Sequence, residues 1–186
     1  LEQGISDWIY GLNVIIDKMI NDNIDNIYLV GSSMGGWISM LAYIDRLKSL
    51  NNTQKIKGLL LLAPAFNFTE ELIWNKLSRA KQNKMMKEGY IEYGEKKYSY
   101  NISFNLIKDG RKYLTDWQNI KNNININIIH GTRDNIIPYQ NSIDICNNIS
   151  SNKVILSLIK GGDHSLSKNY DLDFIAKSCD NLIKTS

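Results

Sequence analysis

The sequence has 186 residues, of which 43% are hydrophobic and 22% charged, and its formal net charge is +3. This composition is typical of one globular domain with a core, rather than of a disordered chain. No basic stretch is interleaved with stacking aromatic residues, so we expect no nucleic-acid partner. No apolar run is long enough to span a bilayer, so we expect no stable membrane insertion. Cys146 and Cys179 lack disulfide-framework spacing, which predicts a cytoplasmic, reducing location.

The predicted elements alternate between helices and short apolar strands. Residues 5–20 have the three-and-four spacing of an amphipathic helix, whose start Ser6 or Asp7 can cap. Buried strands are predicted over 27–30, 56–62, 124–129 and 154–159, and further helices over 37–50, 139–149 and 172–183. Continuous apolar strands separated by helices are typical of a parallel sheet covered on both faces. The sequence therefore predicts an α/β fold, a three-layer α/β/α sandwich with a parallel sheet.

Residues 67 to about 120 differ in character from the rest of the chain. They are rich in Lys, Tyr, Trp and Met, and they contain helical pieces but no convincing strand. We interpret this segment as a helical cap insertion that lies over the end of the sheet. No repeat or linker divides the chain, so we expect one domain over 1–186 that includes this insertion.

A glycine-flanked serine motif lies between the first predicted strand and the next helix. Residues 31–35, Gly-Ser-Ser-Met-Gly, match G-x-S-x-G in the setting that this motif requires. Ser33 is then held on a strained turn with its hydroxyl above the sheet, and a side chain at either glycine is expected to collide with the adjoining elements. The N–H groups of the following helix point toward a developing oxyanion. The alternative is a phosphate-binding turn, but its Gly-Lys-Ser/Thr ending is missing.

A serine hydroxyl is a weak nucleophile until a base accepts its proton. In sequences with such a turn, the acid follows the serine along the chain and the histidine follows the acid. The sequence contains two histidines, His130 and His164. His164 follows the last predicted strand in a glycine-rich loop and is the candidate base. His130 precedes the candidate acid, which is the wrong order. We interpret it as a hydrogen-bonded residue at a strand end.

The acid must lie between the serine and the histidine, on a loop after a strand, where it can orient the imidazole. Asp134 occupies that place, within residues 130–138. The other aspartates lie in a predicted helix, beside the histidine, or in the insertion: Asp144, Asp163, Asp109 and Asp116. Asp134 is therefore the candidate acid.

Four segments carry a resemblance to a known family: GSSMGGW (31–37), LIKDGR (106–111), HGTRDNIIP (130–138) and GDHSL (162–166). Together they resemble the α/β-hydrolase family and, more closely, its bacterial members related to the mitochondrial acyl-protein thioesterase that removes palmitoyl groups. The resemblance implies an α/β-hydrolase fold with Ser33, Asp134 and His164 as the catalytic triad. It also implies that the amide of Met34 is one oxyanion donor, and that neither a cofactor nor a metal is needed.

Members of that family place several strands before the strand that leads to the serine, and a loop among them supplies the second oxyanion donor. This chain has one predicted helix there. We therefore expect an N-terminally incomplete domain, the C-terminal part of the fold, with roughly sixty or more residues missing before Leu1.

The resemblance implies a serine hydrolase that cleaves carboxylic ester or thioester bonds through an acyl-serine intermediate. Its expected substrate is a small acyl ester or thioester, or an acylated protein. An apolar slot for an acyl chain would be lined by Trp37, Trp74, Met85, Tyr90 and Phe104, although packing of the cap explains the same pattern. The alternatives are an acyltransferase or peptidase with the same triad, and a non-catalytic or binding-only fragment.

Overall fold

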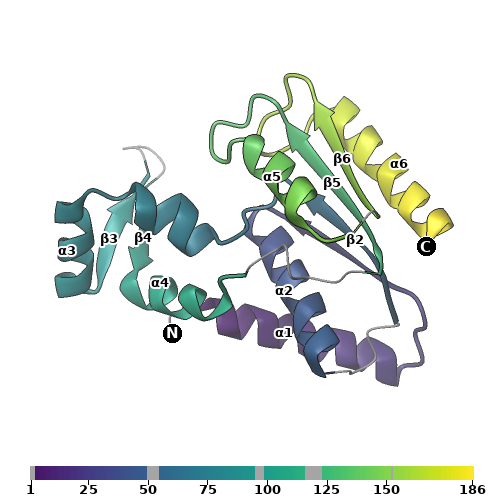
Figure 1. Cartoon of the computed structure of the whole chain (residues 1–186), viewed down its shortest axis with the longest axis horizontal. Coiled ribbons are helices and arrows are strands. Elements are labelled where there is room, and N and C mark those ends of the chain that lie inside the picture. Colours follow the sequence, from purple (N-terminus) through teal and green to yellow (C-terminus); the bar gives the residue numbers. More distant parts are fainter. Residues whose placement is uncertain (1–2, 50–54, 95–98, 116–122, 152) are drawn as a thin grey trace. The chain divides into compact units, whose positions relative to one another are not determined.

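The computed structural model describes residues 3–49, 55–94, 99–115, 123–151 and 153–186 (Figure 1). They belong to two compact units. We call Ile9–Phe66 with Asp116–Ser186 the sheet unit, and Leu1–Trp8 with Asn67–Thr115 the insertion unit.

The sheet unit is built on four parallel strands in the order β1-β2-β5-β6. Their bounds are β1 (Ile27–Ser32), β2 (Ile56–Leu62), β5 (Asn125–Gly131) and β6 (Val154–Ile159). All four were predicted from continuous apolar runs, and the parallel sheet is confirmed. β1 extends two residues further than expected, to Ser32, and so leads directly into the serine motif. Because the strands are parallel, the loops that follow them meet at one edge of the sheet.

Helices cover both faces of this sheet, which confirms the three-layer architecture (Figure 1). One face carries α2 (Met34–Ser49) and α5 (Gln140–Asn148), and the other carries α6 (Asn169–Thr185). A buried cluster lies beneath α6: Leu60, Ile129, Ile159, Leu166 and Leu182. Gly58 faces Leu182, where an added Cβ would lie 2.8 Å from a leucine methyl carbon, so the glycine lets α6 approach the sheet.

The first helix, α1 (Ile5–Asn21), begins in the insertion unit and continues in the sheet unit, where it is bonded to α2. Arg46 of α2 donates through Nη2 to the carbonyl of Asn13 (2.9 Å) and to Asp17 Oδ1 (2.8 Å). The arginine is 4% exposed. These bonds satisfy a buried cation, which is otherwise costly to remove from water.

The insertion unit contains two short strands as well as helices, so the all-helical expectation was wrong. α3 (Arg79–Glu88) is followed by β3 (Tyr90–Tyr93), which pairs antiparallel with β4 (Tyr100–Ser103), and then by α4 (Phe104–Gly110). Gly89 ends α3 with φ +85°, a left-handed conformation that glycine adopts without steric cost. Strands of four residues carry too little apolar alternation to stand out in the sequence. Residues 116–120 of the expected insertion lie outside the described residues.

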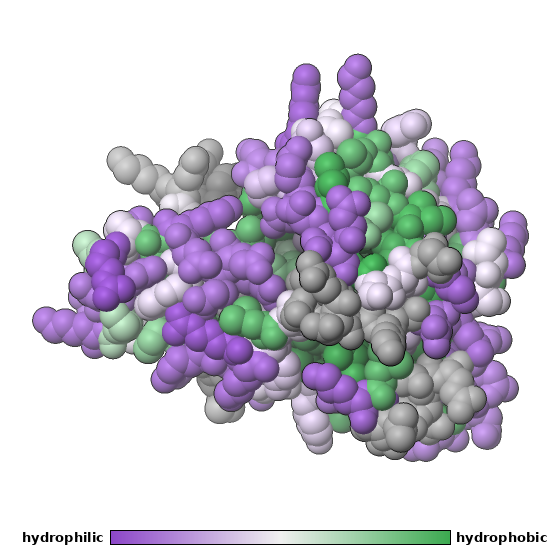
Figure 2. Space-filling model, in the orientation of Figure 1, coloured by the Kyte–Doolittle hydropathy of each residue, from purple (hydrophilic) through white to green (hydrophobic). Residues whose placement is uncertain are grey.

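The insertion unit has a hydrophobic core of its own. Its buried members are Ile73, Leu77, Met85, Ile91, Ile102 and Ile107. Trp74 and Phe104 pack against this core, with ring centroids 5.6 Å apart. Figure 2 shows mainly hydrophilic side chains on the visible surface of this unit and a group of hydrophobic ones over the sheet unit. Among the described residues, no helix is both long and apolar enough to cross a membrane.

Two aspartates satisfy N–H groups at the start of α1: Asp109, which we had not predicted, and Asp7, which was one of the two residues that we had predicted. Asp109 Oδ2 accepts from the backbone N–H of Ser6 (2.7 Å), and Oδ1 accepts from the Ser6 hydroxyl (2.6 Å). Asp7 instead accepts from the backbone N–H of Gly4 (2.8 Å). A carboxylate at a helix N-terminus satisfies free N–H groups and complements the helix dipole.

The two residues after Asp109 also have structural roles. An added Cβ at Gly110 would lie 2.1 Å from Thr69 Oγ1, so a larger residue does not fit there without displacement. Arg111 donates through Nε to Glu70 (2.7 Å), and its guanidinium lies 4.6 Å from the ring centroid of Trp74. The segment that resembles the family at 106–111 therefore holds the insertion unit together.

Candidate active site

Ser33 lies between the end of β1 and the start of α2, in a strained backbone conformation. Its φ is +54°, in the left-handed region that non-glycine residues rarely adopt. Backbone hydrogen bonds hold it there: the Ser33 N–H donates to Leu62 O (2.8 Å), and its carbonyl accepts from Ala65 N (3.0 Å). Strain that is fixed by surrounding bonds is typical of a functional turn.

The glycines around Ser33 do not all have the steric role that we expected. An added Cβ at Gly31 would lie 2.3 Å from the carbonyl oxygen of Gly35, and one at Gly36 would lie 3.0 Å from Pro64 Cβ. At Gly35, an added Cβ meets nothing within 4 Å among the described residues. The expected collision at the second motif glycine is therefore wrong. The tight contact runs from Gly31 to the Gly35 backbone.

The loops after β5 and β6 are bonded to each other at the same edge of the sheet. Arg133 N–H donates to Gly162 O (2.8 Å), and Gly161 N–H donates to Thr132 Oγ1 (2.9 Å). A side chain at Gly131 would lie 2.3 Å from Gly162 O, so glycine permits this approach. The two loops carry Asp134 and His164.

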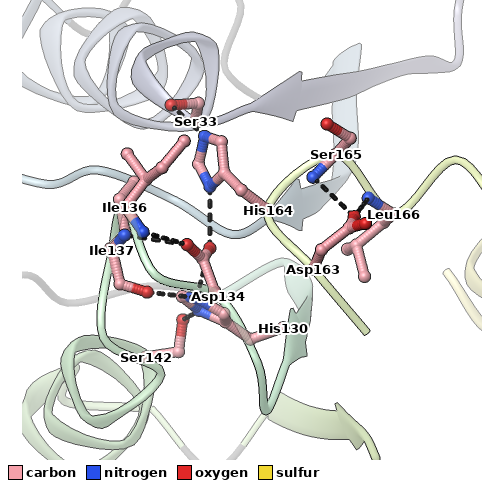
Figure 3. A network of polar contacts seen from close by, with 10 residues as sticks. All are labelled: Ser33, His130, Asp134, Ile136, Ile137, Ser142, Asp163, His164, Ser165 and Leu166. Atoms are coloured by element: carbon pink, nitrogen blue, oxygen red, sulfur yellow. Dashed lines mark hydrogen bonds and ion pairs between the residues drawn. The ribbon is translucent and has the colours of Figure 1, made fainter. Parts of the chain in front are cut away.

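Ser33, His164 and Asp134 form a continuous chain of hydrogen bonds (Figure 3). His164 Nε2 lies 3.1 Å from Ser33 Oγ, and its Nδ1 lies 2.7 Å from Asp134 Oδ2. An ionised carboxylate only accepts, so Nδ1 carries the ring proton and Nε2 is left to accept from the serine hydroxyl. The structure thus brings together the three residues that we selected from separate loops.

The side chain of Asp134 is fully buried and is held from several sides. Its Oδ1 accepts the backbone N–H groups of Ile136 (2.9 Å) and Ile137 (2.8 Å), and its side chain is 0% exposed. Burial opposes the charged form, but the hydrogen bonds from Ile137, His164 and Ile136 outweigh it and lower the pKa of the carboxyl. Asp134 is therefore ionised at neutral pH, as the partner of an imidazolium must be.

His130 is a hydrogen-bonded residue at a strand end, as we interpreted it, but its partner is the candidate acid. Its Nε2 lies 3.0 Å from Asp134 Oδ2 and 3.0 Å from the carbonyl oxygen of Ile137. Its Nδ1 lies 2.7 Å from Ser142 Oγ (Figure 3). His130 and Ser142 are both fully buried. Sequence reasoning missed Ser142, because a serine in a helix gives no sign of its tertiary partner.

The aspartates that we set aside lie elsewhere. Asp163 Oδ1 accepts the N–H groups of Ser165 and Leu166, at 3.1 Å each, and closes the turn after its own position (Figure 3). Asp144 lies within α5, and Asp109 caps α1 in the insertion unit. Asp116 lies outside the described residues.

Met34 is the first residue of α2, so its N–H lies in the turn where helices lack internal acceptors. An oxyanion near Ser33 Oγ would be close to this helix start, whose dipole favours negative charge. Its role as an oxyanion donor stays a prediction.

The five expected substrate-binding residues differ in exposure. Trp37 and Met85 are 0% exposed, Met85 within the core of the insertion unit, whereas Tyr90 is 50% exposed. The Trp37 indole N–H has no hydrogen-bond partner among the described residues. Trp74 and Phe104 contact each other. Packing accounts for Met85, Trp74 and Phe104, and a role in substrate binding stays a prediction for all five.

Comparisons with known proteins agree with this architecture. Mitochondrial palmitoyl-protein thioesterase ABHD10 from Pongo abelii is 30% identical over 159 residues, which are 83% of this chain and 49% of that protein. The chain thus spans about half the length of this curated relative.

Two solved structures share the fold of most of the chain. A crystal structure named "Putative hydrolase" from Agrobacterium vitis S4 matches 97% of this chain and 69% of its own, with a TM-score of 0.87 and 27% identity. The structure of α/β hydrolase domain-containing protein 10 from mouse matches 98% of this chain and 70% of its own, with a TM-score of 0.80 and 24% identity. The α/β-hydrolase fold implied by the sequence resemblance is confirmed.

A family model matches residues 10–172, well over half of the chain. Its description is "Uncharacterised protein family (UPF0227)". The chain therefore belongs to the UPF0227 family, and its relatives and structural neighbours are hydrolases with the α/β-hydrolase fold.

Proposed function

We propose that the protein is a serine hydrolase of carboxylic esters or thioesters, with Ser33 as nucleophile, His164 as general base and Asp134 as the orienting acid. The observation that carries the proposal is the hydrogen-bond chain from Ser33 Oγ through both nitrogens of His164 to Asp134. A serine in a strained turn after a parallel strand, with a base and a buried carboxylate in line, is the arrangement that acyl transfer requires.

The steps follow from this geometry. Ser33 Oγ attacks the carbonyl carbon while its proton passes to His164 Nε2, and the Asp134 carboxylate stabilises the resulting imidazolium. The oxyanion of the tetrahedral intermediate develops near the start of α2, where the Met34 N–H donates to it. His164 then returns the proton to the departing alkoxide or thiolate, leaving an acyl-Ser33. Water, deprotonated by His164, releases the acid by the same route.

The substrate class rests on similarity rather than on the site. The curated relative is named a palmitoyl-protein thioesterase, which supports a thioester or ester of an acyl chain as the substrate. Both are attacked at an acyl carbonyl carbon, so one serine, one base and one oxyanion site serve either of them. We extend the proposal to acylated proteins as one form of this substrate.

A fluorophosphonate probe tests the proposal, because it reacts with an activated serine whatever the natural substrate is. We expect the protein to be labelled and Ser33→Ala to abolish both labelling and hydrolysis of p-nitrophenyl esters, a loss of more than about a thousandfold. Ser32→Ala is the matched control, since Ser32 is the exposed neighbour at the end of β1. Equal labelling of Ser33→Ala and the unmodified protein would rule out Ser33, and no labelling of either would favour a binding-only role.

A further inference from the structure

We propose that His130 is a positioning residue for the candidate acid, holding the carboxylate of Asp134 toward His164 through a hydrogen bond from Nε2–H. This inference rests on the proposed function, because Asp134 matters in this way only if His164 acts as a base. Among the side-chain hydrogen bonds of the described residues, none joins His130 to Ser33, so His130 acts through Asp134 and not on substrate.

The carboxylate of Asp134 is fixed at both oxygens, by different means. Two backbone N–H groups hold Oδ1, and they belong to the same turn as Asp134 itself. Oδ2 has two side-chain partners, His164 Nδ1 at 2.7 Å and His130 Nε2 at 3.0 Å. Of these, His164 is the group to be oriented. His130 is therefore the partner that fixes Oδ2 independently of the reacting residues.

The surroundings of the His130 ring decide which nitrogen carries its proton. Nε2 faces two acceptors, Asp134 Oδ2 and Ile137 O, each at 3.0 Å, so the proton must be on Nε2. Nδ1 then accepts, and the Ser142 hydroxyl at 2.7 Å is its donor. Burial lowers the pKa of His130 against the opposing effects of the Ile137 carbonyl and Asp134, which keeps the ring neutral at pH 7.

The result is a relay of five side chains: Ser142, His130, Asp134, His164 and Ser33 (Figure 3). α5 supplies the hydroxyl that sets the tautomer, β5 supplies the ring, and the loops supply the rest. A fully buried imidazole costs free energy unless its nitrogens are satisfied. An apolar side chain would fill the same space, so packing by itself does not require a histidine here.

Two substitutions at His130 separate the effect of losing the hydrogen-bond donor from the effect of changing the side-chain volume. His130→Gln places an amide N–H near the position of Nε2, whereas His130→Leu fills the space and donates nothing. We expect kcat per active site, titrated with the fluorophosphonate probe, to fall about 10- to 100-fold in His130→Leu with KM within about twofold. His130→Gln should recover kcat to within about fivefold of the unmodified protein.

Ser142→Ala tests the relay without altering the ring, and alanine is well accepted in a helix. Loss of the donor to Nδ1 should lower kcat per titrated site about two- to tenfold, again with KM unchanged. Ser39→Ala is the matched control, because Ser39 is a buried serine of α2 (5% exposed) outside the relay. We expect it to leave kcat per titrated site unchanged.

Normalising to titrated sites removes any loss of folded protein from the comparison. The inference is overturned if His130→Leu keeps the unmodified kcat per site, or if His130→Gln is as impaired as His130→Leu. If neither His130 variant folds, Ser142→Ala decides: a kcat equal to that of Ser39→Ala overturns the relay. Failure of the proposed function is distinguishable, because it appears as an unlabelled unmodified protein or as an active Ser33→Ala.

Discussion

In the sheet unit, polar side chains from the loops after β1, β5 and β6, from strand β5 and from helix α5 meet in a single network at one edge of the sheet. In the insertion unit, polar side chains cap α1 and join neighbouring elements, as in the hydrogen-bonded group of Asp109, Ser6, Lys112 and Tyr113. Asp134 and Asp109 show the contrast. Both are carboxylates with pKa values below the usual range, and burial opposes the shift in both. Asp134 orients an imidazole, whereas Asp109 closes the start of a helix.

This difference shows how a family resemblance should be interpreted. Three of the four resembling segments supply the residues at the sheet edge, and the fourth, 106–111, builds the insertion unit. A segment can therefore match a family through residues that hold a fold together. Two aspartates in matching motifs can have different structural surroundings.

The sharpest test of this contrast exchanges each carboxylate for its neutral isostere. Asp134→Asn should lower kcat by about 10⁴-fold, because the amide favours the wrong imidazole tautomer. Asp109→Asn should leave kcat per titrated site unchanged and reduce stability by about 1 kcal/mol through weaker capping. Esterase assays with active-site titration measure the first effect, and urea unfolding measures the second. Similar kcat losses in both variants would break the comparison.

Glycine substitutions extend the comparison to packing. At Gly31 an added Cβ would lie 2.3 Å from a backbone oxygen, which cannot rotate away. Gly31→Ala should therefore reduce the free energy of unfolding by an amount at or above the upper end of the about 1–3 kcal/mol range that is typical of overpacking. At Gly110 the obstacle is the Thr69 side chain at 2.1 Å, so Gly110→Ala should cost less, within that range of about 1–3 kcal/mol.

Gly35→Ala is the control for both, because an added Cβ there meets nothing among the described residues. It should be neutral or stabilising by up to about 1 kcal/mol, since alanine favours helix. Urea unfolding of the three variants gives the order of their free energies of unfolding. A Gly35→Ala protein as unstable as Gly31→Ala would contradict the packing that we describe.

The last expected effect is a pH dependence of stability between pH 7 and 5, which arises in the sheet unit because that unit contains both histidines. Burial keeps His130 neutral when folded, and Asp134 and His164 are the ionisable groups that act on it. The unfolded chain takes up a proton on this residue near pH 6.5, so the free energy of unfolding should decrease as the pH falls from 7 to 5. One such group contributes at most about 1.4 kcal/mol per pH unit.

Unfolding by urea at several pH values measures this slope, and His130→Gln should make it shallower. The lowered pKa of Asp134 acts in the same direction, with its contribution lost only as the pH falls below about 4. An unchanged slope between pH 7 and 5 in His130→Gln would show that the native state does not exclude the proton from this ring.

The sequence by itself determined the features of this protein that depend on residues close together in the chain. Apolar runs predicted all four strands of the sheet, because the strands of a parallel sheet that helices cover on both faces are rich in apolar residues. The motif around Ser33 predicted the turn, since strand, serine, glycine and helix are consecutive. Chain order then separated His164 from His130, and the position on a loop after a strand separated Asp134 from the other aspartates.

Only the tertiary structure decided which side chains meet. Asp109 caps Ser6 across 103 positions of sequence, and Ser142 reaches His130 from a neighbouring helix, so no local pattern marks either pair. The tertiary structure also decided which glycines are closely packed. An added Cβ at Gly36 would meet Pro64 from another loop, whereas one at Gly35 would face open space among the described residues. Local spacing predicts elements and motif residues, whereas hydrogen-bond partners depend on how separate elements pack.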